Sequence, residues 1–203
     1  MKSYIPQDSR YIPLTQQKWL CVPTCIQMVM LRHRIPLVSA ELMANLMGLV
    51  VPEEDLKYFW NANTGSRPNS GWGTQVGKPQ WGPNSVFKKL GIPLSMSWNL
   101  IHKFKDKDKF SAYLAELETR DVDTLVCYDW GTLFEKNHHG GHLCVLDRVD
   151  MKNHTVRIID PEYEAPKWRT VSIDALYAAM QFHGKEKSGG FWELKKVERK
   201  KYV

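Results

Sequence analysis

The sequence contains no apolar run that approaches the roughly 18 residues a membrane-spanning helix needs. Its first segment, Met1 to Arg10, lacks the apolar stretch of an export signal. We therefore expect a cytoplasmic protein without a membrane span. Only four cysteines are present, and thiols stay reduced in the cytosol. We therefore expect the cysteines to be core thiols, metal ligands or a nucleophile rather than disulfide partners.

Internal repeats and low-complexity segments are also missing, and the charge is not of one sign. Lys and Arg number 28 against 22 Asp and Glu, which gives a net charge of +6. Much of the excess lies in residues 195–201, but no aromatic-basic recognition pattern accompanies it, so we expect no nucleic-acid partner. With 43% hydrophobic residues, the 203-residue chain has enough apolar material for one packed domain over residues 1–203.

The sequence pattern changes from helical to strand-like along the chain. Helices are predicted at 22–34, from the Ser39 N-cap to about residue 49, after Pro52, at 84–90 and at 110–120. Strands are predicted at 124–130, 142–149, 155–159 and 191–197, with a helix at 172–182. This order predicts an α+β fold, with a helical lobe at about 1–120 and an antiparallel sheet lobe at about 121–203.

Between the helix predicted after Pro52 and the helix predicted at 84–90, residues 61–82 have the composition of a long loop, rich in Gly, Asn, Pro and Ser. The loop carries two large rings, Trp72 and Trp81. Long loops of this kind are often functional, so both tryptophans are candidate substrate-binding residues at the rim of a groove. The alternative is that the two rings have only a structural role and anchor the loop to the rest of the protein.

The residues with the clearest chemical potential are Cys21, His142 and Asp160. Cys21 stands at the start of a predicted helix, where unsatisfied N–H groups and the helix dipole favour a thiolate. His142 opens an apolar strand after two glycines, and Asp160 closes the next strand before a proline. A thiol, an imidazole and a carboxylate that orients the imidazole are the three parts of an activated cysteine nucleophile.

Whether Asp160 reaches His142 depends on the register of the hairpin between them. If the turn is centred near Met151, the two residues face each other, with Cβ atoms about 5 Å apart on one face of the sheet. A slip of one residue would place their side chains on opposite faces. Upstream of Cys21, Gln16 and Gln17 each offer an amide that, with the Cys21 N–H, is suited to hold an oxyanion.

These residues occur in an order that resembles the papain superfamily, above all the bacteriocin-leader-processing peptidases and their single-domain relatives. The segment QQKWLCVPTCIQMVM resembles the start of that family, and WGPNSVFKKLGIPL resembles its short helix closed by Leu-Gly. GGHLCVLDRVD and VRIIDPE resemble its Gly-His strand opening and its Asp-Pro strand closing. The resemblance implies a papain-like fold and a peptidase that forms a thioester acyl-enzyme on a peptide or protein substrate, without a cofactor or metal.

The same resemblance assigns the nucleophile to Cys21, the catalytic histidine to His142 and the orienting carboxylate to Asp160. The chain departs from the family pattern at Leu20 and Val22, where the family has Asp and Gly. It also carries Thr15 at the position six residues before the nucleophile, where the family has its Gln. The C-terminal half resembles phytochelatin synthase as well, which leaves a transpeptidase as an alternative.

Three further alternatives follow from the residues. A non-catalytic papain-like protein that binds peptides would explain Leu20 and Val22. A structural zinc site would use the pairs Cys21–Cys25 and His138–His142, whose spacings suit the metal. Finally, Cys25 is a second candidate nucleophile, although it lies one turn inside the helix, where the dipole effect is weaker.

Overall fold

The structure of the protein is a computed structural model that describes residues 6–61, 64–163 and 167–197. Within these ranges the α-helices are α1 (Cys21–Arg32), α2 (Ala40–Leu46), α3 (Pro83–Leu90), α4 (Lys107–Thr119), α5 (Trp130–Leu133) and α6 (Ile173–His183). Short 3₁₀ helices lie at Glu53–Tyr58, Pro79–Trp81, Ile101–Lys103 and Lys185–Lys187. None of the helices in the described ranges has the length and apolar character needed to cross a bilayer.

The strands are β1 (Leu94–Leu100), β2 (Asp123–Asp129), β3 (Gly141–Asp150), β4 (Thr155–Ile159), β5 (Trp168–Ser172) and β6 (Gly190–Lys196). They form one antiparallel sheet in the order β1-β6-β2-β3-β4-β5, so the α+β class and the antiparallel sheet are as predicted. The sheet begins at Leu94, before the expected lobe boundary near residue 121. The alternation of apolar and polar residues in LSMSWNL is the period-two signal that indicates β1.

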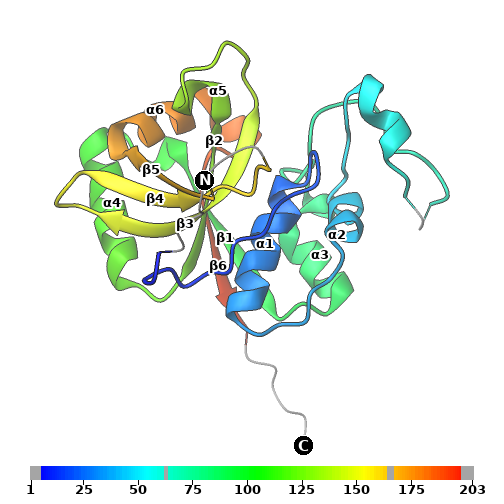
Figure 1. Ribbon diagram of the computed structural model, residues 1–203, viewed down its shortest axis with the longest axis horizontal. Coiled ribbons are helices and arrows are strands. Elements are labelled where there is room, and N and C mark those ends of the chain that lie inside the picture. Colours follow the sequence, from blue (N-terminus) through cyan, green and yellow to red (C-terminus); the bar gives the residue numbers. More distant parts are fainter. Residues whose placement is uncertain (1–5, 62–63, 164–166, 198–203) are drawn as a thin grey trace, which may run out of the picture.

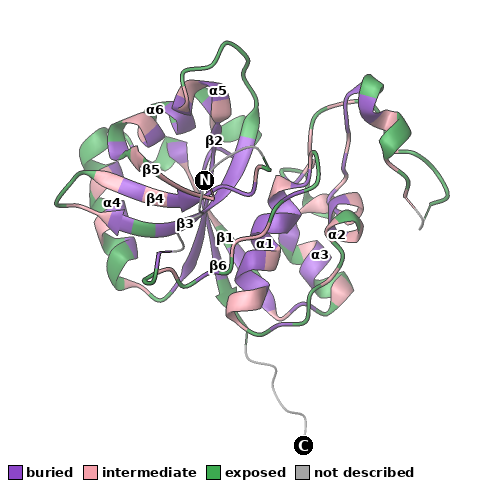
Figure 2. Cartoon of the chain, viewed as in Figure 1, coloured by how far each residue is buried: buried purple, intermediate pink, exposed green. Residues whose placement is uncertain are grey.

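Helices cover both faces of the sheet, as Figure 1 shows. On one side α1 packs on β3 and α3 on β1, around a core that includes Met28, Phe87 and Trp192. On the other side α4 and α6 enclose a second core with Phe110 and Phe191. Figure 2 shows that β2 and most of β3 are buried, whereas the 3₁₀ helix at 53–58 is largely exposed. The helices on the two faces hold the strands in place, and the candidate site lies at one end of these strands.

The β3–β4 pairing contains a bulge that decides where Asp160 lies. Near the turn Asp150 pairs with Thr155, and beyond Asp147 the register shifts so that Val145 pairs with Ile159. One step further along this register places Asp160 opposite Cys144, two residues from the predicted partner His142. Because the difference is two residues, Asp160 still shares a face of the sheet with His142 and lies on its diagonal. Without the bulge, the register near the turn would continue, and the Asp160 side chain would lie on the opposite face of the sheet from His142.

Candidate active site

Cys21 is the first residue of α1 and is partly exposed, whereas the other three cysteines are buried. The preceding Leu20 provides no side-chain cap, and the first turn of α1 contains no acidic residue. The N–H groups at this helix end therefore have no side-chain acceptor of their own and favour a negative charge close by. This is the environment in which a thiolate, or an oxyanion formed on a substrate, is stabilised.

His142 is the second residue of β3 and is only 8% exposed. Its Nε2 donates a 2.8 Å hydrogen bond to Oδ1 of Asp160. Burial lowers the pKa of His142, but its interactions with the neighbouring side chains of Cys144, Asp160 and Cys21 outweigh burial and raise the pKa well above the ordinary value. The imidazole is thus held in its charged form beside the Cys21 thiol, and an imidazolium in contact favours the thiolate.

Asp160 is fully buried and is held from three directions. Its Oδ1 accepts the hydrogen bond from His142 and a second one, of 3.0 Å, from the backbone N–H of Glu162. Its Oδ2 forms an ion pair with Arg169 Nε at 3.1 Å, and the Arg169 guanidinium lies over the Phe134 ring. Burial raises the pKa of Asp160, but the His142 hydrogen bond and these neighbours lower it below the ordinary value.

A second thiol, Cys144, also lies beside His142, and it was not singled out from the sequence. Cys144 has no exposed surface, and its Sγ forms a 3.0 Å hydrogen bond with the Tyr128 hydroxyl. Burial raises the pKa of Cys144 to about 11, so it stays a neutral thiol at physiological pH. Its spacing of two residues from His142 on the same strand is the sequence signal that places the two side chains on one face.

The alternatives for Cys25 and for zinc fit the structure poorly. Cys25 is buried within α1, its thiol donates to the Leu143 carbonyl oxygen at 3.2 Å, and burial raises its pKa well above the ordinary value. Among the described residues, the one group of three candidate metal ligands with donor atoms within 4.8 Å of one another is His142, Cys144 and Asp160. This group shares only His142 with the predicted zinc ligands.

The two candidate oxyanion residues differ in their surroundings. Gln17 is exposed, whereas Gln16 is buried next to the turn that carries Asp160. The Gln16 backbone N–H donates to the Pro161 carbonyl oxygen at 2.8 Å, and its Nε2 donates to Oε2 of Glu162 at 2.8 Å. One hydrogen of the Gln16 amide therefore remains for a substrate oxygen. The structure places Gln16, and not Gln17, beside the candidate triad.

The two loop tryptophans also lie in different environments. Trp72 is 70% exposed, and its ring meets the ring of Trp19 edge to face at a centroid distance of 5.1 Å. Trp81 packs on Gly48, where an added Cβ would lie 2.4 Å from the indole, and Lys78 covers the ring at 4.9 Å. Trp81 therefore anchors the loop on the end of α2, and a substrate contact by Trp81 stays a prediction.

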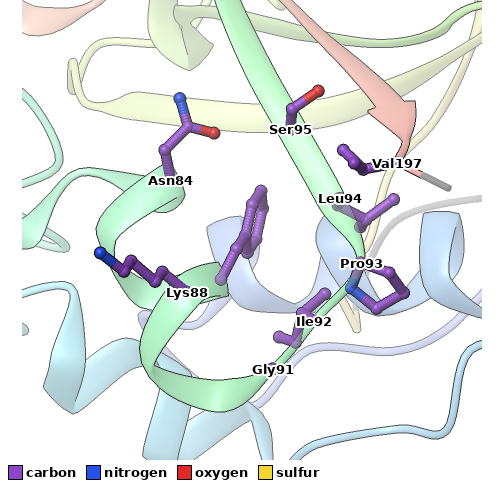
Figure 3. A pocket seen from close by; sticks show the side chains of 9 residues that line it. Asn84, Lys88, Gly91, Ile92, Pro93, Leu94, Ser95 and Val197 are labelled. Atoms are coloured by element: carbon purple, nitrogen blue, oxygen red, sulfur yellow. The ribbon is translucent and has the colours of Figure 1, made fainter. Parts of the chain in front are cut away.

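A pocket of about 410 Å³ lies between α3 and the start of β1, and Figure 3 shows its lining, which includes Lys88, Ile92 and Leu94. Leu94 pairs with Lys196 at one end of the sheet. His142 pairs with Tyr128 at the opposite end. None of the candidate catalytic residues lines this pocket. It is therefore separate from the candidate active site.

No protein-family model and no curated protein matches this chain at a significant level. The arrangement of Cys21, His142 and Asp160 is therefore interpreted from its own geometry.

Proposed function

We propose that this protein is a cysteine-type hydrolase with a papain-like fold that cleaves a peptide or amide bond. The observation that carries the proposal is the position of His142, which bonds the buried carboxylate of Asp160 and lies close enough to Cys21, at the start of α1, for the Cys21 side chain to help raise its pKa. The resemblance of the segments around Cys21 and His142 to bacteriocin-leader-processing peptidases supports the same assignment.

In the acylation step, His142 holds the proton of Cys21 as an imidazolium, and the thiolate attacks the substrate carbonyl carbon. A C–S bond forms, and the electron pair of the C=O bond moves to the oxygen. The Cys21 backbone N–H and the remaining amide hydrogen of Gln16 are the donors for this oxyanion. When the intermediate collapses, the C–N bond breaks and His142 gives its proton to the leaving amine.

In the second step, His142 takes a proton from water, and the resulting hydroxide attacks the thioester carbon. The C–S bond breaks, the substrate leaves as a carboxylic acid, and the Cys21 thiolate is restored beside the protonated His142. Asp160 holds the imidazole in one orientation and stabilises its charge throughout. An amine in place of water at this step would give the transpeptidase alternative.

The experiment that tests the proposal compares the rates at which iodoacetamide labels each cysteine across a range of pH, read by peptide mass spectrometry. We expect Cys21 alone to react quickly below the pKa of an ordinary thiol, because the charged imidazole beside it stabilises the thiolate. His142→Ala should abolish the fast reaction. His139→Ala is the matched control, since it removes another imidazole that bonds a carboxylate, that of Asp129.

The same labelling separates Cys21 from Cys144, the other thiol that contacts His142. Cys144→Ala should leave the fast labelling of Cys21 intact, whereas a fast reaction at Cys144 would contradict the assignment. Cleavage of a peptide library by the native protein, lost in Cys21→Ser, would then establish hydrolysis. If Cys21 reacts no faster than the same cysteine in the unfolded chain, the non-catalytic peptide-binding protein takes the place of the hydrolase.

A further inference from the structure

The segment that leads into Cys21 has an unusual backbone conformation at Trp19. Trp19 has a φ of +67°, a region that bulky side chains rarely occupy. Its indole Nε1 donates a 2.7 Å hydrogen bond to Oδ2 of Asp55, a carboxylate that is 4% exposed. Lys18 pairs with the same carboxylate at 2.8 Å. Backbone strain of this kind persists only where the surroundings hold it, and it concentrates at functional sites.

The fixed Trp19 ring carries an exposed partner from a distant part of the sequence. Trp72 meets it edge to face at 5.1 Å and an angle of 82°, yet 70% of Trp72 remains exposed. The loop that carries Trp72 is attached to the protein by backbone bridges from Val50 to Gly73 and from Val51 to Ser70. Both rings therefore sit on anchored backbone, and the exposed surface of Trp72 is available to a ligand.

This tryptophan pair, Trp19 and Trp72, lies beside the candidate nucleophile. Only Leu20 separates Trp19 from Cys21, so the Cα atoms of Trp19 and Cys21 are at most about 7.5 Å apart. The residues just before Trp19 reach the turn that carries Asp160. The Tyr163 side chain is close enough to Lys18 to help raise the Lys18 pKa. Gln16 bonds Glu162 in the same turn. Trp19 thus belongs to the short segment that joins Gln16, at the Asp160–Glu162 turn, to Cys21 at the start of α1.

The geometry points to the tryptophan pair as a subsite that binds a large apolar or aromatic side chain of the substrate next to the bond attacked by Cys21. The inference rests on the proposed function for the presence of a substrate at Cys21. An indole held by a neighbouring ring offers a large apolar surface at low entropic cost, and aromatic pairs prefer edge-to-face or offset contacts of the kind that Trp72 already makes.

The test measures alkylation of Cys21 by two reagents with the same reactive group, iodoacetamide and iodoacetanilide, which carries an added phenyl ring. We expect iodoacetanilide to be favoured by about three- to tenfold over iodoacetamide at Cys21, relative to the ratio in the unfolded chain. Trp72→Ala should remove this preference by lowering the iodoacetanilide rate toward the iodoacetamide rate. Trp72→Phe should keep most of it, because the ring is retained.

Trp60→Ala is the matched control, because Trp60 is 60% exposed and is not part of the tryptophan pair. An unchanged preference in Trp72→Ala, or no preference in the native protein, overturns the subsite. A different result would contradict the proposed function, namely that both reagents label Cys21 at the slow rate of the unfolded chain. His142→Ala distinguishes the two, since it should lower both rates and leave their ratio unchanged.

Discussion

Gln16 Nε2 donates a 2.8 Å hydrogen bond to Oε2 of Glu162, a residue 146 positions away in the chain. Glu162 also donates its backbone N–H to Asp160, the carboxylate that holds His142. The turn from Asp160 to Glu162 therefore positions two parts of the candidate site at once. It orients the imidazole through one carboxylate and the candidate oxyanion donor through another.

This relationship predicts the effect of substitutions at Glu162 on cleavage. Gln16→Ala should lower kcat about 10²-fold, the effect of one oxyanion donor, and Glu162→Ala should lower kcat less, because the amide remains but is no longer oriented. Glu162→Gln, which keeps an acceptor oxygen, should restore most of the rate. Gln17→Ala is the control and should have no effect, because Gln17 is exposed. Steady-state assays on a cleaved peptide check these rates.

Alkylation of Cys21 by iodoacetamide passes through no oxyanion. Its rate should therefore stay unchanged in Gln16→Ala and in Glu162→Ala. A fall in the alkylation rate parallel to the fall in kcat would show that these residues support the thiolate or the fold, and would contradict an oxyanion role for Gln16.

The buried pair of His142 and Asp160 predicts how stability depends on pH. The pKa of Asp160 is lowered in the folded protein, so its contribution is present above the unfolded value of about 4 and is lost as the pH falls. The pKa of His142 is raised, so its contribution is full below about 6.5 and is lost as the pH rises through the folded value. Together they give a stabilisation that is greatest at weakly acidic pH.

Asp160→Asn should therefore lower the free energy of unfolding by about 3 kcal/mol near pH 6, because it leaves His142 and Arg169 without their partner. The loss should shrink at pH values above the raised pKa of His142. Urea unfolding at pH 6 and pH 10 measures it. Asp174→Asn, which removes an exposed carboxylate paired with Lys107, should change little at either pH. An equal loss at both pH values for Asp160→Asn would contradict the charged pair.

The packing of Trp81 on Gly48 predicts an unusual sensitivity at this glycine. Gly48 has a φ of +69°, and an added Cβ would meet the Trp81 ring at 2.4 Å. Gly65 has nearly the same φ, +63°, but open space around it. Gly65→Ala should cost about 1 kcal/mol of strain, and Gly48→Ala about 1 to 3 kcal/mol more. Equal losses in urea unfolding would show that the indole moves away without cost.

Much of the site could be predicted from local sequence. A proline in the first turn and a run of apolar residues predict a helix that begins near Cys21, because these preferences act within a few residues. Glycines before His142 and a proline after Asp160 mark the ends of two apolar strands for the same reason. The strand β1 was missed although its alternating pattern was present, and the Cys144 contact with His142 follows from a spacing of two residues on one strand.

Other features were decided only by the tertiary structure. The extra residue at Asp147 returned Asp160 to the face of His142, and a bulge depends on how two strands pack, which short patterns do not encode. Gln16 was distinguished from Gln17 by its contact with Glu162, and Trp72 from Trp81 by the presence of Trp19 and Gly48. The sequence by itself determined which side chains stand at the ends of helices and strands. Packing between segments far apart in the chain determined which of these side chains meet, because contacts over such distances form only when both layers close on the sheet.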